Sequence, residues 1–183
     1  MSLHLRALAT LTALSIACGA GSPTGQRWKP GTQIQVTVGE LVPIPKSEVV
    51  RALREGAAQF GLTVTEQPVW GQWIDVEAVE QCICRSCSPA TVAYVLQSEY
   101  RTIHVCNRAA RPVADLGAAV AADGVIKHEL GHVLGNPDHL APGPDVLMSG
   151  SQLDQRPVPR RFSAADVAFI CQAGGVDTDE CGQ

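Results

Sequence analysis

The sequence predicts one α+β domain, because segments with strand periodicity and segments with helical periodicity occur within its 183 residues. Apolar and polar residues alternate in Gln33–Val38 and again in Trp73–Val79, which indicates strands with one buried face. Apolar residues recur at helical spacing in residues 47–60 and 126–134. We therefore expect a twisted mixed β-sheet with a backing helix, a central helix and a C-terminal helix.

The elements between these segments follow from local signals. We expect Ser47 to cap the first helix, a second strand at residues 62–66, and a pair of strands at residues 92–97 and 101–106. Residues 116–122 fit either an early helical turn or a loop lining a cleft. Asp123 is expected to cap the central helix.

The last helix has the strongest cap signal. Ser163 and Asp166 have the spacing of a capping box, in which each side chain bonds the backbone of the other residue.

The N-terminus has the pattern of an export signal. Arg6 precedes the apolar residues 7–17, which are too few to span a bilayer as a permanent helix, so residues 1–17 are interpreted as a signal peptide. Cys18 and the small residues after it resemble a bacterial lipoprotein cleavage site, with Ser15 where leucine is usual. Cys18 is therefore a candidate lipid anchor, residues 18–30 a tether, and residues 31–183 the folded domain.

The cysteine count supports export. Of seven cysteines, six remain if Cys18 is lipidated or removed, and an even number favours disulfides in an exported chain. We expect one disulfide to join the C-terminal helix to the tail and another to join the strand cysteine to the clustered cysteines. The alternative for the cluster is a second metal site. The residues concerned are Cys171 and Cys181, Cys106, and the cluster Cys82, Cys84 and Cys87.

The central helix contains the chain's chemical motif, His128-Glu129-Leu130-Gly131-His132. Two histidines four residues apart share one face of a helix and can bind one ion, for which zinc is the usual choice. Glu129 lies beside that face, where a carboxylate can take and return the proton of a zinc-activated water as general base and acid. We expect one catalytic Zn²⁺ held in part by His128 and His132.

The chain then turns back towards the motif. Gly135 can adopt the conformation that ends a helix, and Asp138 follows at a position from which a carboxylate could complete the metal site. We expect His139 to be a solvated loop histidine, with a swap of the third ligand from Asp138 to His139 as the alternative. Met148 is expected to pack beneath the site, and His104 to be a strand histidine outside it.

These residues carry a family resemblance. His-Glu-x-x-His-x-x-Gly-x-x followed by a third ligand and a methionine turn is similar to the metzincin signature, and Asp138 with Met148 looks most like the snapalysin family of small secreted bacterial peptidases. The resemblance implies a metzincin-like fold and zinc endopeptidase activity. Leu140 stands where that family would have a tyrosine near the catalytic centre, which puts the contribution of that phenol in question.

The sequence thus predicts an exported zinc-dependent endopeptidase, a monomer that is secreted, periplasmic or lipid-anchored at the bacterial cell envelope. A net charge of -4 gives no indication of nucleic-acid binding, and membrane contact is expected only through Cys18. The expected partner is a peptide or protein substrate. Two alternatives are a surface-binding lipoprotein that keeps zinc without turnover and a zinc amidase acting on cell-wall material; the intact Glu129 argues against the first.

Overall fold

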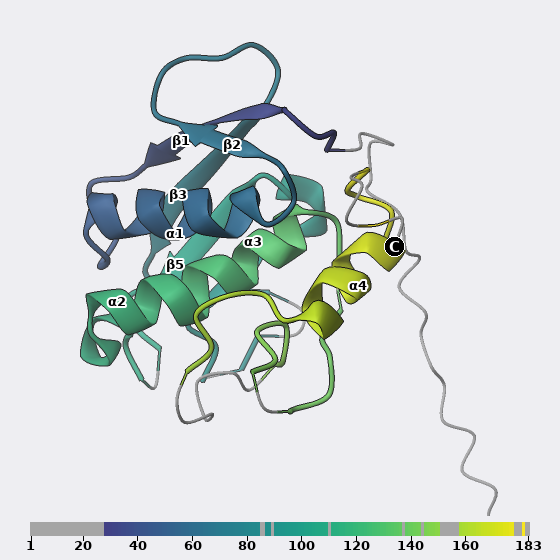
Figure 1. Cartoon of the computed structure of the whole chain (residues 1–183). Helices are drawn as coiled ribbons and strands as arrows, with labels where there is room; N and C mark the ends of the chain where they lie inside the picture. Colours follow the sequence, from purple (N-terminus) through teal and green to yellow (C-terminus); the bar gives the residue numbers. More distant parts are fainter. Residues whose placement is uncertain are drawn as a thin grey trace, which may run out of the picture.

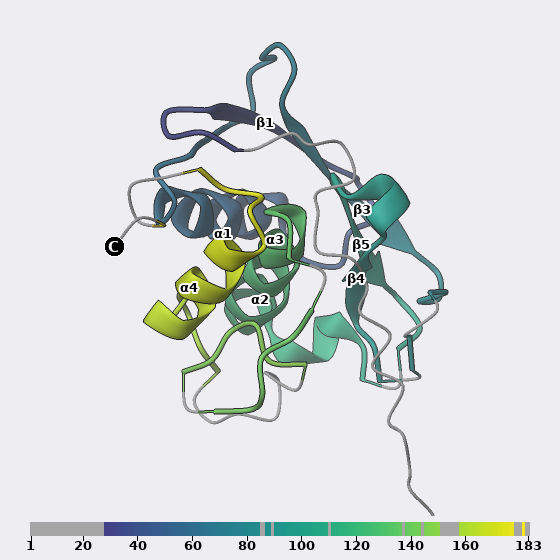
Figure 2. The same ribbon diagram turned by 90° about the vertical axis from the view of Figure 1, so that its right-hand side faces the viewer.

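The computed structural model describes residues 28–84, 87–88, 90–109, 111–136, 138–143, 145–150, 158–177 and 181, so the expected signal peptide and Cys18 lie outside the described part. Within it, a five-stranded sheet has the order β2-β1-β3-β5-β4, and the main helices lie on one side of the sheet (Figures 1 and 2). The predicted α+β class is confirmed.

The sheet is mostly parallel. β1 (Gln33–Val38) pairs in parallel with β2 (Thr63–Thr65) and with β3 (Trp73–Val79), and β3 pairs in parallel with β5 (Thr102–Cys106). β4 (Ala93–Val95) is an edge strand that pairs with β5, as the sequence predicts for these two segments, and the pairing is antiparallel. The parallel strands β1, β3 and β5 therefore all begin at the same edge of the sheet.

The backing helix α1 (Lys46–Ala58) begins two residues earlier than the predicted Ser47 cap implies. Its N-cap is Pro45, without a side-chain cap, and the Pro45 carbonyl accepts from Glu48 N at 2.9 Å and from Val49 N at 3.1 Å. The predicted Ser47 cap is therefore wrong, because Ser47 already lies within the first turn.

The central helix is longer than predicted and has a wide turn. The helix α2 (Ala118–Val120), the π-helical segment η3 (Ala121–Ile126) and α3 (Lys127–Val133) follow one another directly, which resolves residues 118–122 as helix. The predicted Asp123 cap is wrong. Asp123 lies within the helical segment, and its buried carboxylate pairs with Lys127 Nζ at 2.9 Å.

That ion pair belongs to a larger network behind α3. Lys127 Nζ, which is almost fully buried, also donates to Glu55 Oε2 at 2.8 Å, and Arg51 contacts Asp123 at 3.3 Å. Buried charges are costly unless paired, so the network joins α1 firmly to the segment that leads into the motif.

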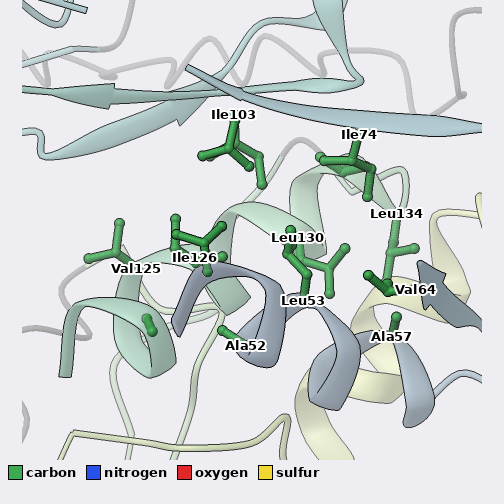
Figure 3. Packing of buried hydrophobic residues seen from close by; sticks show 14 of the residues in the cluster. Ala52, Leu53, Ala57, Val64, Ile74, Ile103, Val125, Ile126, Leu130 and Leu134 are labelled. Carbon is green, nitrogen blue, oxygen red and sulfur yellow. The ribbon is translucent and has the colours of Figure 1, made fainter. Parts of the chain in front are cut away.

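The apolar face of α3 packs between α1 and the sheet (Figure 3). The side chains of Ile126, Leu130 and Leu134 are fully buried, and they face Ile74 and Ile103 of the sheet. Gly56 lets α1 approach closely, since a Cβ there would lie 2.8 Å from a methyl carbon of Leu130. The predicted apolar face of the motif helix is confirmed.

The helix α4 (Ala164–Gln172) begins with the predicted capping box. Ser163 Oγ accepts from Asp166 N at 3.2 Å, and Asp166 Oδ2 accepts from Ser163 N at 2.8 Å. Within the described residues, no helix is both long and apolar enough to span a bilayer.

The six domain cysteines form three disulfides, Cys82–Cys106, Cys84–Cys87 and Cys171–Cys181. Both predicted connections are confirmed: Cys106 of β5 joins the cluster, and Cys181 of the tail joins α4. Because all three cluster cysteines are in disulfides, the alternative of a second metal site in this cluster does not hold. Disulfides are consistent with an oxidising location outside the cytosol.

Candidate metal centre

The helix α3 places His128 and His132 one turn apart on the same face. Their Nε2 atoms lie 3.1 Å from each other, and the ring planes are nearly perpendicular, at 82°. His128 is buried and His132 is half-buried. The predicted histidine pair is therefore present, with the Nε2 atoms of both rings directed towards a common position.

Each of these rings is oriented by a backbone carbonyl. His128 Nδ1 lies 2.7 Å from the Leu147 carbonyl oxygen, and His132 Nδ1 lies 2.6 Å from that of Asn136. A carbonyl only accepts, so each Nδ1 carries the hydrogen and donates it. In the neutral rings the lone pairs are then on Nε2, which is the tautomer that a metal site needs.

His139 supplies the third nitrogen. Its Nε2 lies 3.1 Å from that of His128, and its ring stacks on the His128 ring at 20°. The three ligand atoms of His128, His132 and His139 all lie within 4.8 Å of one another.

This spacing suits zinc. A tetrahedral Zn²⁺ with bonds of about 2.0–2.1 Å separates its nitrogen ligands by roughly 3.3–3.4 Å, close to the 3.1 Å between the Nε2 atoms here. Lone pairs at that separation repel one another unless a cation lies between them. The residues present therefore fit a bound zinc ion.

The structure brings His139, and not Asp138, to the two helix histidines. Asp138 is exposed, and its carboxylate does not belong to the converging group. Its backbone N–H donates to Asn136 Oδ1 at 3.0 Å, which sets the turn between the helix and the returning chain. The geometry favours the alternative that the sequence left open, in which His139 is the third ligand.

A short bridge supports the returning segment. Leu140 N donates to the Met148 carbonyl at 2.9 Å, and Leu140 pairs with Ser149 in an isolated parallel bridge. Gly150 lies against the His139 ring, which a Cβ at that position would approach to 3.6 Å. Leu140 thus contributes a backbone contact that locates its neighbour His139.

Asp166 holds the methionine turn from below. It is fully buried, its Oδ2 accepts from Leu147 N at 3.0 Å, and its Oδ1 accepts from Met148 N at 2.7 Å. These bonds fix the Leu147 carbonyl that orients His128. Sequence reasoning found Asp166 only as a helix cap and missed this second role.

Asn136 has a comparable role for His132. It is buried, and its Nδ2 donates to the Phe169 carbonyl of α4 at 2.7 Å. The asparagine thus anchors the turn whose carbonyl holds the His132 ring. An asparagine before proline is typical of such turns and is the signal that could have indicated this role.

Gly135 allows this turn to pass close to the tail. Its φ is +112°, a region that favours glycine, and a Cβ there would lie 2.8 Å from the Gly175 Cα. The predicted sharp exit of the chain from the helix is confirmed. His104 lies apart from the converging histidines: it is in β5 and contacts Glu99 Oε2 at 3.1 Å.

Met148 packs directly beneath the motif helix, as the sequence predicts. It is fully buried, and its sulfur occupies the space that a Cβ on Gly131 would need. We expect Gly131→Ala to lower the free energy of unfolding by about 1–3 kcal/mol through overpacking. Because the clash is with Met148, the double variant with Met148→Ala should be less destabilised than the sum of the single variants, as measured by urea denaturation. Strict additivity would contradict this contact.

Glu129 combines burial with a missing partner. It is 5% exposed, and its Oε2 has no hydrogen-bond partner among the described residues. Burial raises the pKa of Glu129 to about 8. Burial also lowers the pKa of His132 to about 4 and that of His128 well below its usual value, so both rings are neutral and able to bind metal at pH 7.

The raised pKa of Glu129 predicts how the stability of the metal-free protein depends on pH. Its folded pKa of about 8 lies above the reference value of 4.5, so its contribution is full below pH 4.5 and is lost as the pH rises towards 8. In chelator-treated protein, the free energy of unfolding should fall from pH 5 to pH 8 relative to Glu129→Gln, by an amount on the order of a few kcal/mol. Parallel pH profiles of the two proteins would show that Glu129 is not buried in this way.

No protein-family model matches the sequence, and no curated protein matches it closely enough to indicate a relationship. The resemblance to metzincins and snapalysins therefore depends on the motif residues alone.

Proposed function

We propose that this protein is a zinc-dependent endopeptidase in which His128, His132 and His139 hold the metal and Glu129 transfers protons. The observation that supports the proposal is the convergence of three histidine nitrogens within 4.8 Å. The residue after His128 is the buried Glu129, whose Oε2 has no partner within the part of the chain that the structure describes. A purely structural zinc site would have a fourth protein ligand, and among the described residues the converging group has three members.

The chemistry divides between the metal and the chain. A Zn²⁺ held by three imidazoles supplies Lewis acidity, which polarises a peptide carbonyl and makes water a stronger nucleophile at neutral pH. Glu129 Oε2 accepts the proton of the attacking water and returns it to the amine that leaves. A cation beside Glu129 lowers its pKa from about 8, so the carboxyl is ionised and can act as the base.

The backbone carbonyls keep the site in order. The hydrogen bonds from His128 to Leu147 and from His132 to Asn136 hold the rings with Nε2 towards the metal position and raise the basicity of those nitrogens. Asp166 and Asn136 hold those carbonyls in turn through α4. The site therefore needs little rearrangement to bind the ion.

We also propose that the protein acts outside the cytosol, at the bacterial cell envelope. Its three disulfides and the sequence of residues 1–18 support export, and Cys18 is the proposed lipid anchor. The substrate would then be an extracellular or envelope peptide or protein, and the protein itself a monomer.

Substrate class can be tested with the purified chain and one panel of substrates. We expect cleavage of casein and of a mixed peptide library, loss of cleavage after chelation, and recovery after zinc is added back. Peptidoglycan fragments should remain intact. Zinc-dependent release of amino groups from peptidoglycan, with casein untouched, would replace the endopeptidase by the amidase. No zinc-dependent hydrolysis of any substrate would favour the binding lipoprotein.

A further inference from the structure

Two tryptophans that are close in the sequence, Trp70 and Trp73, are exposed at one edge of the sheet. Trp70 is fully exposed, at 102% of its reference area, and Trp73 is 45% exposed. Trp70 lies in the loop between β2 and β3, which projects beyond the sheet in Figure 1, and Trp73 begins β3. Single exposed apolar side chains are common on protein surfaces, but two indoles near each other form an apolar surface that a partner can cover.

The loop that carries Trp70 is held in place by side chains. The guanidinium of Arg101 lies 4.1 Å from the centre of the Trp73 ring, and its Nη1 donates to the Gly71 carbonyl at 2.9 Å. Val69 N donates to Gln35 Oε1 at 3.4 Å. A buried arginine thus supports the loop from inside the domain, and the exposed indole is presented in a defined position.

The tether enters the domain at this same edge. Trp28 is the first described residue and lies in the segment predicted as the tether, and Arg101 lies 5.8 Å from its ring as well as stacking on Trp73. Trp28 is fixed to the C-terminal part of the chain, since its backbone N–H donates to the Gly175 carbonyl at 2.8 Å. Residues 19–27 separate Cys18 from Trp28, and ten extended steps span at most about 33–36 Å.

We propose that the loop of residues 66–72, with Trp73, is a second membrane contact, in which Trp70 inserts into the interface of the bilayer that carries the Cys18 anchor. An indole has an apolar body and one N–H donor, which suits the headgroup region. The anchor at Cys18 would hold the domain close to the bilayer, so a second, weaker contact there would be intramolecular and would fix which side of the domain meets the membrane. The proposal depends on the anchor at Cys18 and is independent of the zinc chemistry.

The charge of this loop gives no preference for an anionic bilayer. Glu66 is the one charged residue in the sequence of this loop, and it pairs with Lys46 at 2.6 Å. The loop therefore offers no basic cluster for anionic headgroups, and we expect binding to a zwitterionic bilayer that changes little with salt.

Leu41 provides a matched control. Leu41 is apolar and 80% exposed, so it is comparable with Trp70. It follows the end of β1, however, and therefore lies at the opposite edge of the sheet. A general affinity of apolar side chains for lipid would affect both positions. Insertion of the edge that carries Trp70 would change the lipid contact of Trp70 only.

The test uses the full chain recovered from bacterial membranes and reconstituted in phosphatidylcholine vesicles, with or without brominated acyl chains that quench nearby tryptophans. Quenching is expected in the parent and should fall in Trp70→Phe, with the remainder, from Trp73, lost in the double variant Trp70→Phe, Trp73→Phe. The double variant Trp70→Phe, Leu41→Trp, which moves the fluorescent side chain to the other edge, should be quenched no more than Trp70→Phe alone. No quenching in the parent, or equal quenching from position 41, would overturn the proposal.

A binding measurement extends the test. In the Cys18→Ser background, Trp70→Ser should lower partitioning into phosphatidylcholine vesicles by about tenfold, equivalent to about 1.4 kcal/mol, whereas Leu41→Ser should not. A Trp70-dependent dimer in solution, or Trp70-dependent binding to isolated cell-wall glycan in place of vesicles, would also overturn it. Both assays can be run in chelator, so their failure is separate from any failure of the peptidase.

Discussion

Glu129→Gln is expected to lower kcat/KM for peptide cleavage by about 10²–10⁴-fold, the usual contribution of a general acid–base group. Glutamine fits the same buried space and cannot accept the proton of the attacking water. The carboxylate is outside the converging ligand group, so the variant should still bind zinc at the level of the parent. Steady-state cleavage of one fluorogenic peptide, with zinc counted in both samples, measures the two effects separately.

Glu99→Gln is the matched control for this substitution. Glu99 is also a glutamate beside a histidine, since it contacts His104 at 3.1 Å, but this pair lies outside the converging group. We expect its cleavage rate to equal that of the parent. Full activity in Glu129→Gln would remove Glu129 from the mechanism, and loss of zinc in that variant would make it part of the metal site instead.

His139→Ala is expected to weaken zinc binding by more than about 100-fold, the upper end of the loss caused by removing an outer hydrogen-bond partner of a ligand. The reason is that His139 Nε2 lies 3.1 Å from His128 Nε2 and completes the donor set. Asp138→Ala should keep zinc, because the Asp138 carboxylate does not belong to the converging group. Competition with a chromophoric chelator gives both affinities.

The two substitutions at adjacent positions serve as controls for each other. If Asp138→Ala loses zinc and His139→Ala keeps it, the third ligand is the aspartate that the snapalysin-like spacing implies. If both keep zinc, the site depends on the two helix histidines and the proposed set of three is wrong. His104→Ala, a histidine in β5, should leave zinc binding unchanged.

The sequence predicts the frame of this fold well because periodicity reports which face is buried. The strands Gln33–Val38 and Trp73–Val79 have the bounds that alternation predicts, and the apolar spacing of Leu130 and its neighbours locates the motif helix on the sheet. Caps were less predictable. Ser163 caps α4, whereas Asp123 is buried as an ion-pair partner of Lys127. The local sequence favours a capping role for an aspartate whether or not it becomes a buried ion-pair partner, and only the tertiary contact decides between these two roles.

The candidate site was predictable where the helix fixes it and ambiguous beyond the helix end. Four-residue spacing places His128 and His132 together without knowledge of the fold. The choice between Asp138 and His139 depends on a rotation of the returning chain, which is set by the Asn136 side chain and by the Leu140 bridge to Met148. The Asn136 bond to Asp138 is local, but the Asn136 contact with the Phe169 carbonyl and the Leu140 contact with Met148 form only in the folded chain, so a local pattern alone does not decide between the two residues.

The zinc K-edge X-ray absorption spectrum of the purified, peptide-cleaving protein tests the central claim most directly. We predict close to one zinc per chain, with scattering from three imidazole rings at about 2.0–2.1 Å and one further light atom. That result would establish the centre built by His128, His132 and His139. A sample that cleaves peptide without zinc, or a zinc ion bound by fewer than three imidazoles, would contradict the account.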